Sequence, residues 1–396
     1  MIRPSPRSRS GDRSPVVPGG PLILTPHVRH YPWGGHGPSS FLRRFLGRSE
    51  RRLPFAEAWF GAHPLGSSVV AASHQTLYDV LRRRGPGGSA GTSPLSCMAK
   101  IIDVRRPLSL QVHPGAAGAR RGFRRENRAG IPRDSPHRVF RDPNAKPEYL
   151  MALSSFELFA GWLPRARWRA DRYCRAVLAG ARVPLTAPVR SVVGRVTELS
   201  PGAVRRLGRR VFSAVPRSTG GRTGWLNRLW RDHGETRGDP ATLLVPFMAY
   251  HRLKPGDGLL VPAGVAHTYL SGAGLEAMRS SDNVLRLGLT EKARRPREAR
   301  SALSPAARPR RVLRGTGPFR SADFRVTPMG AGSLAWRGPA LFLPTHRALT
   351  LAIDGGVFPV PRGRALFLPA SGVGGVSAPA GGGMAGVLVE GRFSVE

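Results

Sequence analysis

One strand-and-turn pattern occurs twice in this chain, and it restricts the possible fold more than any other feature. The first copy is Lys254-Pro-Gly-Asp-Gly-Leu-Leu-Val-Pro-Ala-Gly264, and the second is Pro361-Arg-Gly-Arg-Ala-Leu-Phe-Leu-Pro-Ala-Ser371. Each copy reads as a Pro/Gly turn, an apolar strand, and then Pro-Ala with a small residue. Such a repeated unit is typical of small β-barrels, so we expect a mainly β protein with two barrels. Only the first copy continues into a histidine, His267, so if one barrel carries a metal, it is the first.

The pattern of apolar runs divides the rest of the chain. Residues 1–20 are rich in Arg, Ser and Pro and predict a flexible tail. Short apolar runs between Gly/Pro turns predict strands before residue 163 and again from residue 246. We therefore expect 21–162 with 246–300 to form one barrel domain, and 301–396 to form the second.

The segment 163–245 predicts helices instead. Ser200 is a suitable N-cap, and Pro201 suits the first turn of a helix. Apolar residues then recur at spacings of three and four, which indicates one buried helix face. They are Val204, Leu207, Val211 and Val215. The predicted fold class is thus mainly β, with two β-barrel domains and an inserted helical subdomain.

The net charge of +38 is unusual for a chain of 396 residues and by itself favours a nucleic-acid or anionic-membrane partner. Only four of the 62 basic residues are lysine, however, and the arginines are spread over the whole chain. A chain-wide shift toward arginine explains this spread better than a binding face does, so we expect no nucleic-acid partner. The lysines that escaped the shift are then informative. They are Lys100, Lys146, Lys254 and Lys292.

Several classes of protein are excluded by what the sequence lacks. No apolar run approaches the ~18 residues of a membrane-spanning helix, and the first twenty residues hold no secretory apolar stretch. The two cysteines, Cys97 and Cys174, are far apart and lack CxxC spacing, which argues against a disulfide framework or a thiolate zinc site. We expect a cytoplasmic protein without membrane association, and a monomer.

A predicted strand at residues 109–113 carries three polar side chains on one face. Strand alternation turns Ser109, Gln111 and His113 one way, and Leu110 and Val112 toward the core. This face is either the wall of a site or the polar outside of a half-exposed strand.

Two further segments place charged or aromatic groups in restricted positions. In Lys146-Pro-Glu148 the proline restricts the backbone, so both charged side chains are held; the alternative is a solvent-exposed ion pair. After the turn at 262–265, His267 and Tyr269 share a strand face. A lone histidine is more often a structural residue than a ligand, so this segment alone decides nothing.

The last such segment is Ser280–Lys292. Alternation places Asp282, Val284 and Arg286 on one face and three leucines on the other. The aspartate and arginine are either a structural ion pair or part of a wall that binds an anion.

Taken together, Gln111, His113, Glu148 and His267 offer one amide oxygen, one carboxylate and two imidazoles. This donor set suits Zn²⁺ at ~2.0–2.2 Å. A single carboxylate leaves the metal site a formal charge of +1, which preserves Lewis acidity toward a bound oxygen.

The motifs in this order resemble those of the type I phosphomannose isomerase family, which are zinc-dependent cupin enzymes. The resemblance covers nearly everything after residue 21, more weakly in the C-terminal barrel. Its motifs are Tyr31-Pro-Trp-Gly-Gly35, Glu57-Ala-Trp-Phe-Gly-Ala-His63-Pro, Leu108-Ser-Leu-Gln-Val-His-Pro114, Asp142 to Glu148, Pro255-Gly-Asp to Tyr269, and Ser281 to Lys292. It implies two cupin (jelly-roll) barrels, the first with one zinc ion and the second metal-free.

The resemblance also implies roles for individual residues. The implied zinc ligands are Gln111, His113, Glu148 and His267. The implied catalytic residues are Arg286, Lys146 and Asp282. The implied substrate-binding residues are Lys100, Ser109, Tyr269 and Lys292.

The implied activity is the interconversion of mannose 6-phosphate and fructose 6-phosphate. This reaction moves a proton between C2 and C1 through an enediol(ate), so it needs a proton-transferring group and positive charge near the developing oxyanion. The sequence leaves Asp282, Lys146 and a zinc-bound hydroxide open as the base.

Two departures from the family pattern support an alternative function. The family often has histidine before Lys-Pro-Glu, where this chain has Ala145, and it has small residues where this chain has Arg279. Arg279 lies either outside the pocket or in it as a new positive wall. The alternative is a sugar-phosphate-binding cupin with altered or lost catalysis.

Overall fold

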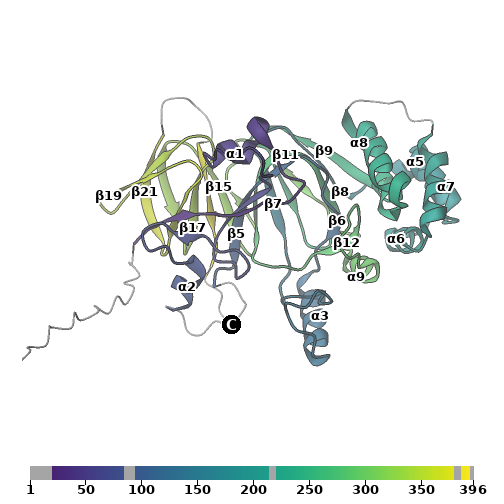
Figure 1. Cartoon of the computed structure of the whole chain (residues 1–396), viewed down its shortest axis with the longest axis horizontal. Coiled ribbons are helices and arrows are strands. Elements are labelled where there is room, and N and C mark those ends of the chain that lie inside the picture. Colours follow the sequence, from purple (N-terminus) through teal and green to yellow (C-terminus); the bar gives the residue numbers. More distant parts are fainter. Residues whose placement is uncertain (1–19, 84–93, 214–219, 379–384, 393–396) are drawn as a thin grey trace, which may run out of the picture.

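The computed structural model describes residues 20–83, 94–213, 220–378 and 385–392. The predicted tail at 1–20 therefore lies, except for its last residue, outside the described part. Antiparallel sheets make up the centre of the molecule, and a group of helices lies at one end (Figure 1). The prediction of a mainly β fold is confirmed.

The largest sheet contains eleven strands and carries the segments that the sequence singled out. Its strands are β2 (His27–Arg29), β3 (Glu57–Phe60), β5 (Cys97–Val104), β6 (Leu110–Val112), β7 (Glu148–Ala152), β8 (Phe156–Trp162), β9 (Met248–Leu253), β10 (Gly258–Val261), β11 (His267–Arg279), β12 (Leu285–Gly288) and β13 (Arg310–Val312).

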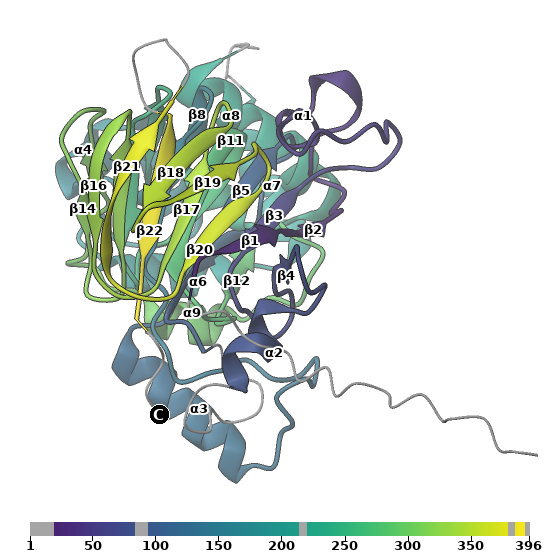
Figure 2. The same ribbon diagram turned by 90° about the vertical axis from the view of Figure 1, so that its left-hand side faces the viewer.

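Two further sheets contain the C-terminal strands (Figure 2). The seven-stranded sheet contains β1 (Leu22–Thr25), β4 (Val69–Val70), β14 (Phe319–Arg320), β15 (Arg325–Met329), β17 (Ala340–Pro344), β20 (Ala365–Leu368) and β22 (Gly386–Glu390). The four-stranded sheet contains β16 (Gly332–Trp336), β18 (Leu349–Ile353), β19 (Gly356–Val360) and β21 (Gly372–Ser377). The first strand of the chain, β1, pairs with β20, while β13 pairs with β10 of the largest sheet. The N-terminal strand thus belongs to a sheet built mainly from C-terminal strands.

The described α-helices are α1 (Phe41–Phe45), α2 (Leu77–Arg82), α3 (Ala116–Arg128), α4 (Arg165–Ala170), α5 (Arg172–Gly180), α6 (Val189–Thr197), α7 (Pro201–Phe212), α8 (Gly221–Leu229) and α9 (Pro296–Ala302). Short helical turns are η1 (Gly37–Ser39), η2 (Trp230–Glu235), η3 (Pro240–Leu243) and η4 (Val245–Phe247). Among the residues described, none of these helices combines the length and apolarity needed to cross a membrane.

Both copies of the repeat form the same turn. Gly256 and Gly363 occupy matching positions with φ of 90° and 82°, a left-handed conformation that favours glycine. In each copy the residue after this glycine donates its backbone N–H to the residue three positions earlier, over 2.9 Å in the first and 3.1 Å in the second. The turns lead into β10 and β20, as the repeat predicts.

Helix α7 begins where the sequence places it. Ser200 Oγ accepts a hydrogen bond from Ala203 N at 3.3 Å, which satisfies one of the unpaired N–H groups of the first turn. Val204, Leu207 and Val211 are buried, while the predicted Val215 lies outside the described residues.

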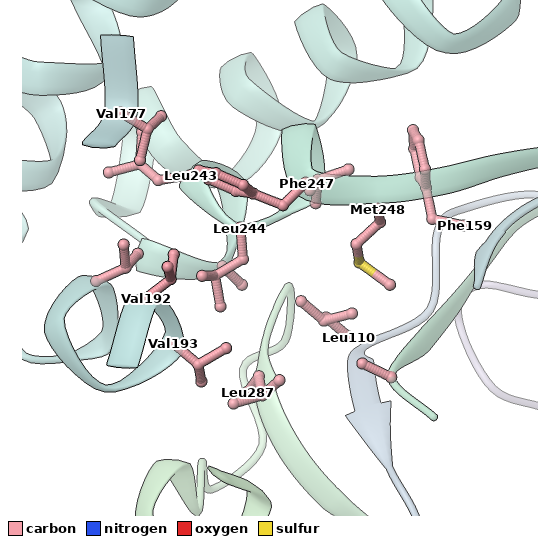
Figure 3. Packing of buried hydrophobic residues seen from close by; sticks show 14 of the residues in the cluster. Leu110, Phe159, Val177, Val192, Val193, Leu243, Leu244, Phe247, Met248 and Leu287 are labelled. Carbon is pink, nitrogen blue, oxygen red and sulfur yellow. The ribbon is translucent and has the colours of Figure 1, made fainter. Parts of the chain in front are cut away.

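The helical region packs against the strands that carry the site. One apolar cluster joins residues of α5, α6, η3 and η4 to Leu110 of β6 and Leu287 of β12 (Figure 3). Because alternate residues of a strand face opposite sides, burying these leucines turns Gln111 and Arg286 the other way.

Strand β11 links the two halves of the largest sheet. Its first residues pair with β6 and β8, and its later residues pair with β5 and β7. In this register His267 lies opposite Gln111, Glu276 opposite Lys100, and Met278 opposite Glu148. One strand therefore gathers polar residues from segments that are far apart in the sequence.

Asp239 connects the helical region to β12. Its buried carboxylate accepts hydrogen bonds from Ala241 N at 2.9 Å and from Leu289 N at 2.7 Å. Leu289 has φ of 55°, an unfavourable conformation for a branched residue, so the second bond stabilises a strained end of the strand.

We predict that Asp239→Ala lowers the free energy of unfolding by about 2–3 kcal/mol, because it leaves two buried N–H groups without acceptors. Urea denaturation measures the change. Asp134→Ala, which removes an exposed aspartate, is the control and is expected to change stability by less than about 0.5 kcal/mol. Equal stability of the two variants would contradict the role of Asp239.

Candidate metal centre and sugar-phosphate pocket

A cavity of about 1030 Å³ opens beside the metal-ligand candidates. Segments from β3, β5, β6, β7, β11 and β12 line it, together with loops and part of the helical region. All the residues that the sequence suggested for catalysis or substrate binding line this cavity: Lys100, Ser109, Lys146, Tyr269, Asp282, Arg286 and Lys292.

Three of the four predicted metal ligands meet at one point. The ligand atoms of His113, Glu148 and His267 lie within 4.8 Å of one another, and all three residues are buried. The two Glu148 carboxylate oxygens lie 3.1 Å from His113 Nε2 and 3.2 Å from His267 Nε2. These separations suit atoms that share one ion at ~2.0–2.2 Å.

The other ring nitrogens of both histidines are already engaged. His113 Nδ1 lies 2.7 Å from the Asn283 carbonyl, and His267 Nδ1 lies 3.1 Å from the Val265 carbonyl. A carbonyl can only accept, so each Nδ1 carries the proton and each Nε2 presents a lone pair toward Glu148.

Gln111, the fourth predicted ligand, lies next to this group on the neighbouring strand β6. The amide nitrogen of Gln111 (Nε2) lies 3.2 Å from His267 Nε2. The hydroxyl of Ser109 donates a hydrogen bond to the amide oxygen of Gln111 (Oε1) at 3.2 Å. A half-turn of the amide exchanges its oxygen and nitrogen and directs the carbonyl oxygen toward the point shared by the other ligands.

A second observation, independent of which residue types are present, supports the binding of a divalent cation: two of the ligand atoms are buried without a hydrogen-bond partner. His113 Nε2 and Glu148 Oε2 are buried, and neither makes a hydrogen bond within the described residues. Burial lowers the pKa of His113 to about 4, so the ring is neutral and able to ligate near pH 7. Burial alone would raise the pKa of Glu148, but first the charge of Lys146 and then contacts with the two histidines hold it well below its usual range.

Lys146 is held directly against the ligand set. Its ammonium lies 2.8 Å from Glu148 Oε1, and both residues are buried rather than exposed to solvent. The pair is therefore not a surface ion pair, the simpler of the two readings that the sequence allowed.

The loop before Lys146 is fixed by the half-buried Asp142. Its carboxylate accepts from Ser281 Oγ at 2.9 Å, from Asp282 N at 2.8 Å and from Asn144 N at 2.9 Å. This network ties the backbone that carries Lys146 to the backbone that carries Asp282.

A second lysine is surrounded by carboxylates. Lys100 Nζ lies 3.5 Å from Glu57 Oε2 and 4.0 Å from Glu276 Oε2, and 4.4 Å from the centre of the Trp59 ring. Tyr269 Oη donates to Glu276 Oε1 at 2.8 Å. Burial, with the charge of Glu148, raises the pKa of Glu276 to about 7.

Three ionisable side chains of this region, Glu57, His63 and Glu276, had no role predicted from the sequence. Glu57 and His63 belong to a quoted motif, and Glu276 lies in the apolar run of β11. His63 is buried, accepts from Leu65 N at 3.2 Å through Nδ1, and places Nε2 3.5 Å from Asp282 Oδ2. The sequence signal that could have identified Glu276 is an acidic residue within an otherwise mainly apolar strand.

The position of Arg279 decides between the two possibilities left open for it. Its side chain does not line the cavity. The guanidinium forms an ion pair with Asp323, from the segment between β14 and β15, and donates to Asn144 Oδ1 at 2.8 Å. Arg279 thus joins the C-terminal region to the loop that carries Lys146. Lys254 lies in an exposed turn, so three of the four lysines line the cavity.

We predict that Arg279 and Asp323 contribute to stability as a coupled pair. A double-mutant cycle with Arg279→Gln and Asp323→Asn should give a coupling free energy of about 0.5–1 kcal/mol in urea denaturation, because the pair is partly shielded. The control pair Arg48 and Glu50, at 3.9 Å and nearly half exposed, should give a coupling near zero. Coupling no larger than in this control would show that the contact is not formed in solution.

Several known proteins are similar in sequence to this chain, and all of them carry the same enzyme name. A model of the phosphomannose isomerase type I catalytic domain matches residues 22–165. The mannose-6-phosphate isomerase of Salmonella typhimurium is 30% identical over 282 residues, covering 67% of this chain and 70% of that protein. That of Escherichia coli is 31% identical over 281 residues, with the same shares. Mannose-6-phosphate isomerase 1 of Arabidopsis thaliana is 26% identical over 392 residues, covering 87% of this chain and 88% of that protein.

Solved structures share the fold. A mannose 6-phosphate isomerase bound with zinc and yttrium superposes with a TM-score of 0.76 at 23% identity, covering 94% of this chain and all of the other. The Salmonella typhimurium enzyme bound to its substrate F6P and zinc gives a TM-score of 0.76, also at 23% identity and with the same coverage.

Proposed function

Because this chain belongs to the type I phosphomannose isomerase family, we propose that it is a zinc-dependent isomerase that interconverts mannose 6-phosphate and fructose 6-phosphate. The observation that carries the proposal is the meeting of His113, Glu148 and His267 at one point beside a cavity lined with cations. Related proteins of this name supply the reaction, and their solved structures with zinc supply the metal. The proposal includes the cytoplasmic location and monomeric state expected from the sequence.

Gln111, His113, Glu148 and His267 would hold the zinc ion. When bound, zinc supplies Lewis-acid stabilisation of the substrate oxygen that becomes negative. Glu148 is the only charged ligand of the four, so the formal charge at the site stays at +1 and this acidity is preserved.

The chain's own residues handle the protons. In the open-chain aldose, a proton leaves C2 and a proton is delivered to C1, while the proton of O2 is lost and O1 gains one. Lys146 and Asp282 were candidates from the sequence, and both line the cavity. Glu276 joins them, since a pKa of about 7 lets its carboxyl both accept and return a proton near neutral pH.

Positive charge beside the reacting oxygens comes from side chains that are already in place. Arg286 lies on β12, where its backbone pairs with Gln111, and its guanidinium lines the cavity. Ser109 Oγ lies within hydrogen-bond distance of the Gln111 amide, and Tyr269 orients Glu276.

The alternative of a sugar-phosphate-binding cupin without catalysis has lost one of its two supports. Arg279 does not reach the cavity and leaves the pocket charge unaltered. Ala145 still contributes no polar group where the family often has histidine. Zinc retained without turnover of mannose 6-phosphate would favour this alternative.

We predict that chelation removes zinc and abolishes turnover of mannose 6-phosphate, and that restoring zinc restores turnover. Elemental analysis paired with an isomerase assay measures both. His267→Ala should lose bound zinc and turnover together, because it removes one of the ligands that meet at Glu148. His251→Ala, which removes a histidine of β9 bonded to the Ala160 carbonyl, is the control and should keep one zinc per chain. Full zinc content in His267→Ala would contradict the ligand assignment.

We predict that Arg286→Ala keeps its zinc and lowers turnover by about 10²-fold or more, as expected for loss of a charge-stabilising group. Metal analysis and kcat/KM for mannose 6-phosphate separate this outcome from a damaged metal site. Turnover near that of the unmodified chain would remove Arg286 from the mechanism.

A further inference from the structure

One buried histidine of the cavity has no part in the mechanism proposed for this chain. His63 belongs to the motif at 57–64, lines the cavity and is only 3% exposed. A buried polar ring beside a substrate pocket is either a structural residue or part of the chemistry. The contacts of its two ring nitrogens decide between these roles.

The first contact fixes the position of the ring proton. His63 Nδ1 accepts a hydrogen bond from Leu65 N at 3.2 Å, and a backbone N–H can only donate, so Nδ1 is unprotonated. Burial lowers the pKa of His63 to about 4, so the ring is neutral near pH 7. A neutral imidazole carries one proton, which is therefore on Nε2.

The second contact is with the carboxylate of Asp282. The protonated Nε2 of His63 lies 3.5 Å from Asp282 Oδ2, a long contact of the kind that tightens when substrate binds. Asp282 N donates to Asp142 Oδ2 at 2.8 Å, which fixes the backbone but not the side chain. Among the described residues, no group other than His63 is in hydrogen-bond or ion-pair contact with this carboxylate. His63 is therefore what holds the Asp282 side chain in one orientation.

The ring of His63 is itself held by a rigid turn. Pro64 restricts the backbone of the residue before it, and Gly66 N closes the turn by donating to the His63 carbonyl at 3.1 Å. The His63 ring packs edge-on against Trp59 of β3, with ring centres 5.4 Å apart. A Cβ at Gly66 would lie 2.9 Å from the Trp59 ring, so the turn packs closely on this strand. The imidazole thus reaches Asp282 from a fixed position.

The nearby cations do not replace His63 as the partner of Asp282. Lys100 and Lys146 are close enough for their charges to act on the His63 ring. Each already lies beside a glutamate, at 3.5 Å and 2.8 Å respectively, and neither is within ion-pair distance of Asp282 among the described residues. A neutral N–H donor is thus the group that meets this carboxylate.

We propose that His63 is a positioning residue: it donates from Nε2 to Asp282 Oδ2 and keeps Asp282 Oδ1 available to accept from the substrate. The inference rests on the proposed function, in which Asp282 is a candidate for proton transfer. Asp282 lies beside the metal centre, because the carbonyl of the next residue, Asn283, is 2.7 Å from His113 Nδ1. A carboxylate held in one orientation accepts a proton more readily than one that rotates, since the proton moves along a hydrogen bond.

The experiment compares kcat and KM for mannose 6-phosphate among zinc-loaded variants. His63→Leu should lower kcat about tenfold or more and change KM by less than about threefold, because the substrate contacts remain. His63→Gln should recover most of kcat, since its amide nitrogen can donate in place of Nε2. His27→Leu is the matched control and should keep the turnover of the unmodified chain. His27 packs against the same Trp59 ring, at 6.2 Å, but is not among the described residues that line the cavity.

A double-mutant cycle with Asp282→Asn separates positioning from a structural effect. His63→Leu should change kcat by less than about twofold once Asp282→Asn is present, because His63 acts through Asp282. Losses that multiply instead of overlapping would overturn the inference. Unchanged kcat in His63→Leu, an equal loss in His63→Gln, or an equal loss in His27→Leu would overturn it as well.

Nitrogen NMR of the His63 ring tests the contact without turnover. The zinc-loaded protein, labelled at histidine, should show a neutral ring at pH 7 with the proton on Nε2, and Asp282→Asn should shift the Nε2 resonance. A proton on Nδ1, or an Nε2 resonance that Asp282→Asn does not move, would overturn the inference. Urea denaturation and zinc content establish that each variant is folded and loaded. The expected NMR result in a chain without isomerase activity would refute the proposed function and leave the His63–Asp282 contact standing.

Discussion

The structure of this site depends on one buried negative charge, the carboxylate of Glu148. A carboxylate withdrawn from water is stable only if cations or donors compensate it. Here the Lys146 ammonium lies 2.8 Å from it, and the Nε2 atoms of two histidines, 3.1 and 3.2 Å away, offer lone pairs with which it would share a cation. Strand β11 must therefore stay in the register that places His267 beside Gln111 and Met278 beside Glu148.

The cavity is lined both by lysines that lie close to carboxylates and by cations without an ion pair among the described residues. Lys100 and Lys146 are of the first kind, whereas Arg286 and Lys292, which line the same cavity, are of the second. The Asp142 network connects these regions, because it fixes the backbones of Arg141, Lys146 and Asp282 at once. One hydrogen-bond network thus fixes the backbones of three residues that line the cavity.

The lysines show how the pocket differs from the surface. The chain uses arginine almost everywhere, yet three of its four lysines line the cavity. Lys100 and Lys146 are enclosed by carboxylates at short range, where a compact ammonium fits and a planar guanidinium needs more room. The helical region and the C-terminal sheets contribute by packing: the leucines of β6 and β12 face the helices, and Arg279 connects the site loop to Asp323.

The sequence by itself determined the elements whose cause is local. Alternation placed Gln111 and His113 on one face and the leucines of 285–289 on the other, and the two Pro/Gly turns and the Ser200 cap were readable from a few neighbouring residues. The tertiary structure alone decided the rest. The pairing of Glu276 with Lys100, the contact of His63 with Asp282, and the partner of Arg279 each join segments more than forty positions apart. Their geometry depends on strand register and loop packing, which no local pattern encodes.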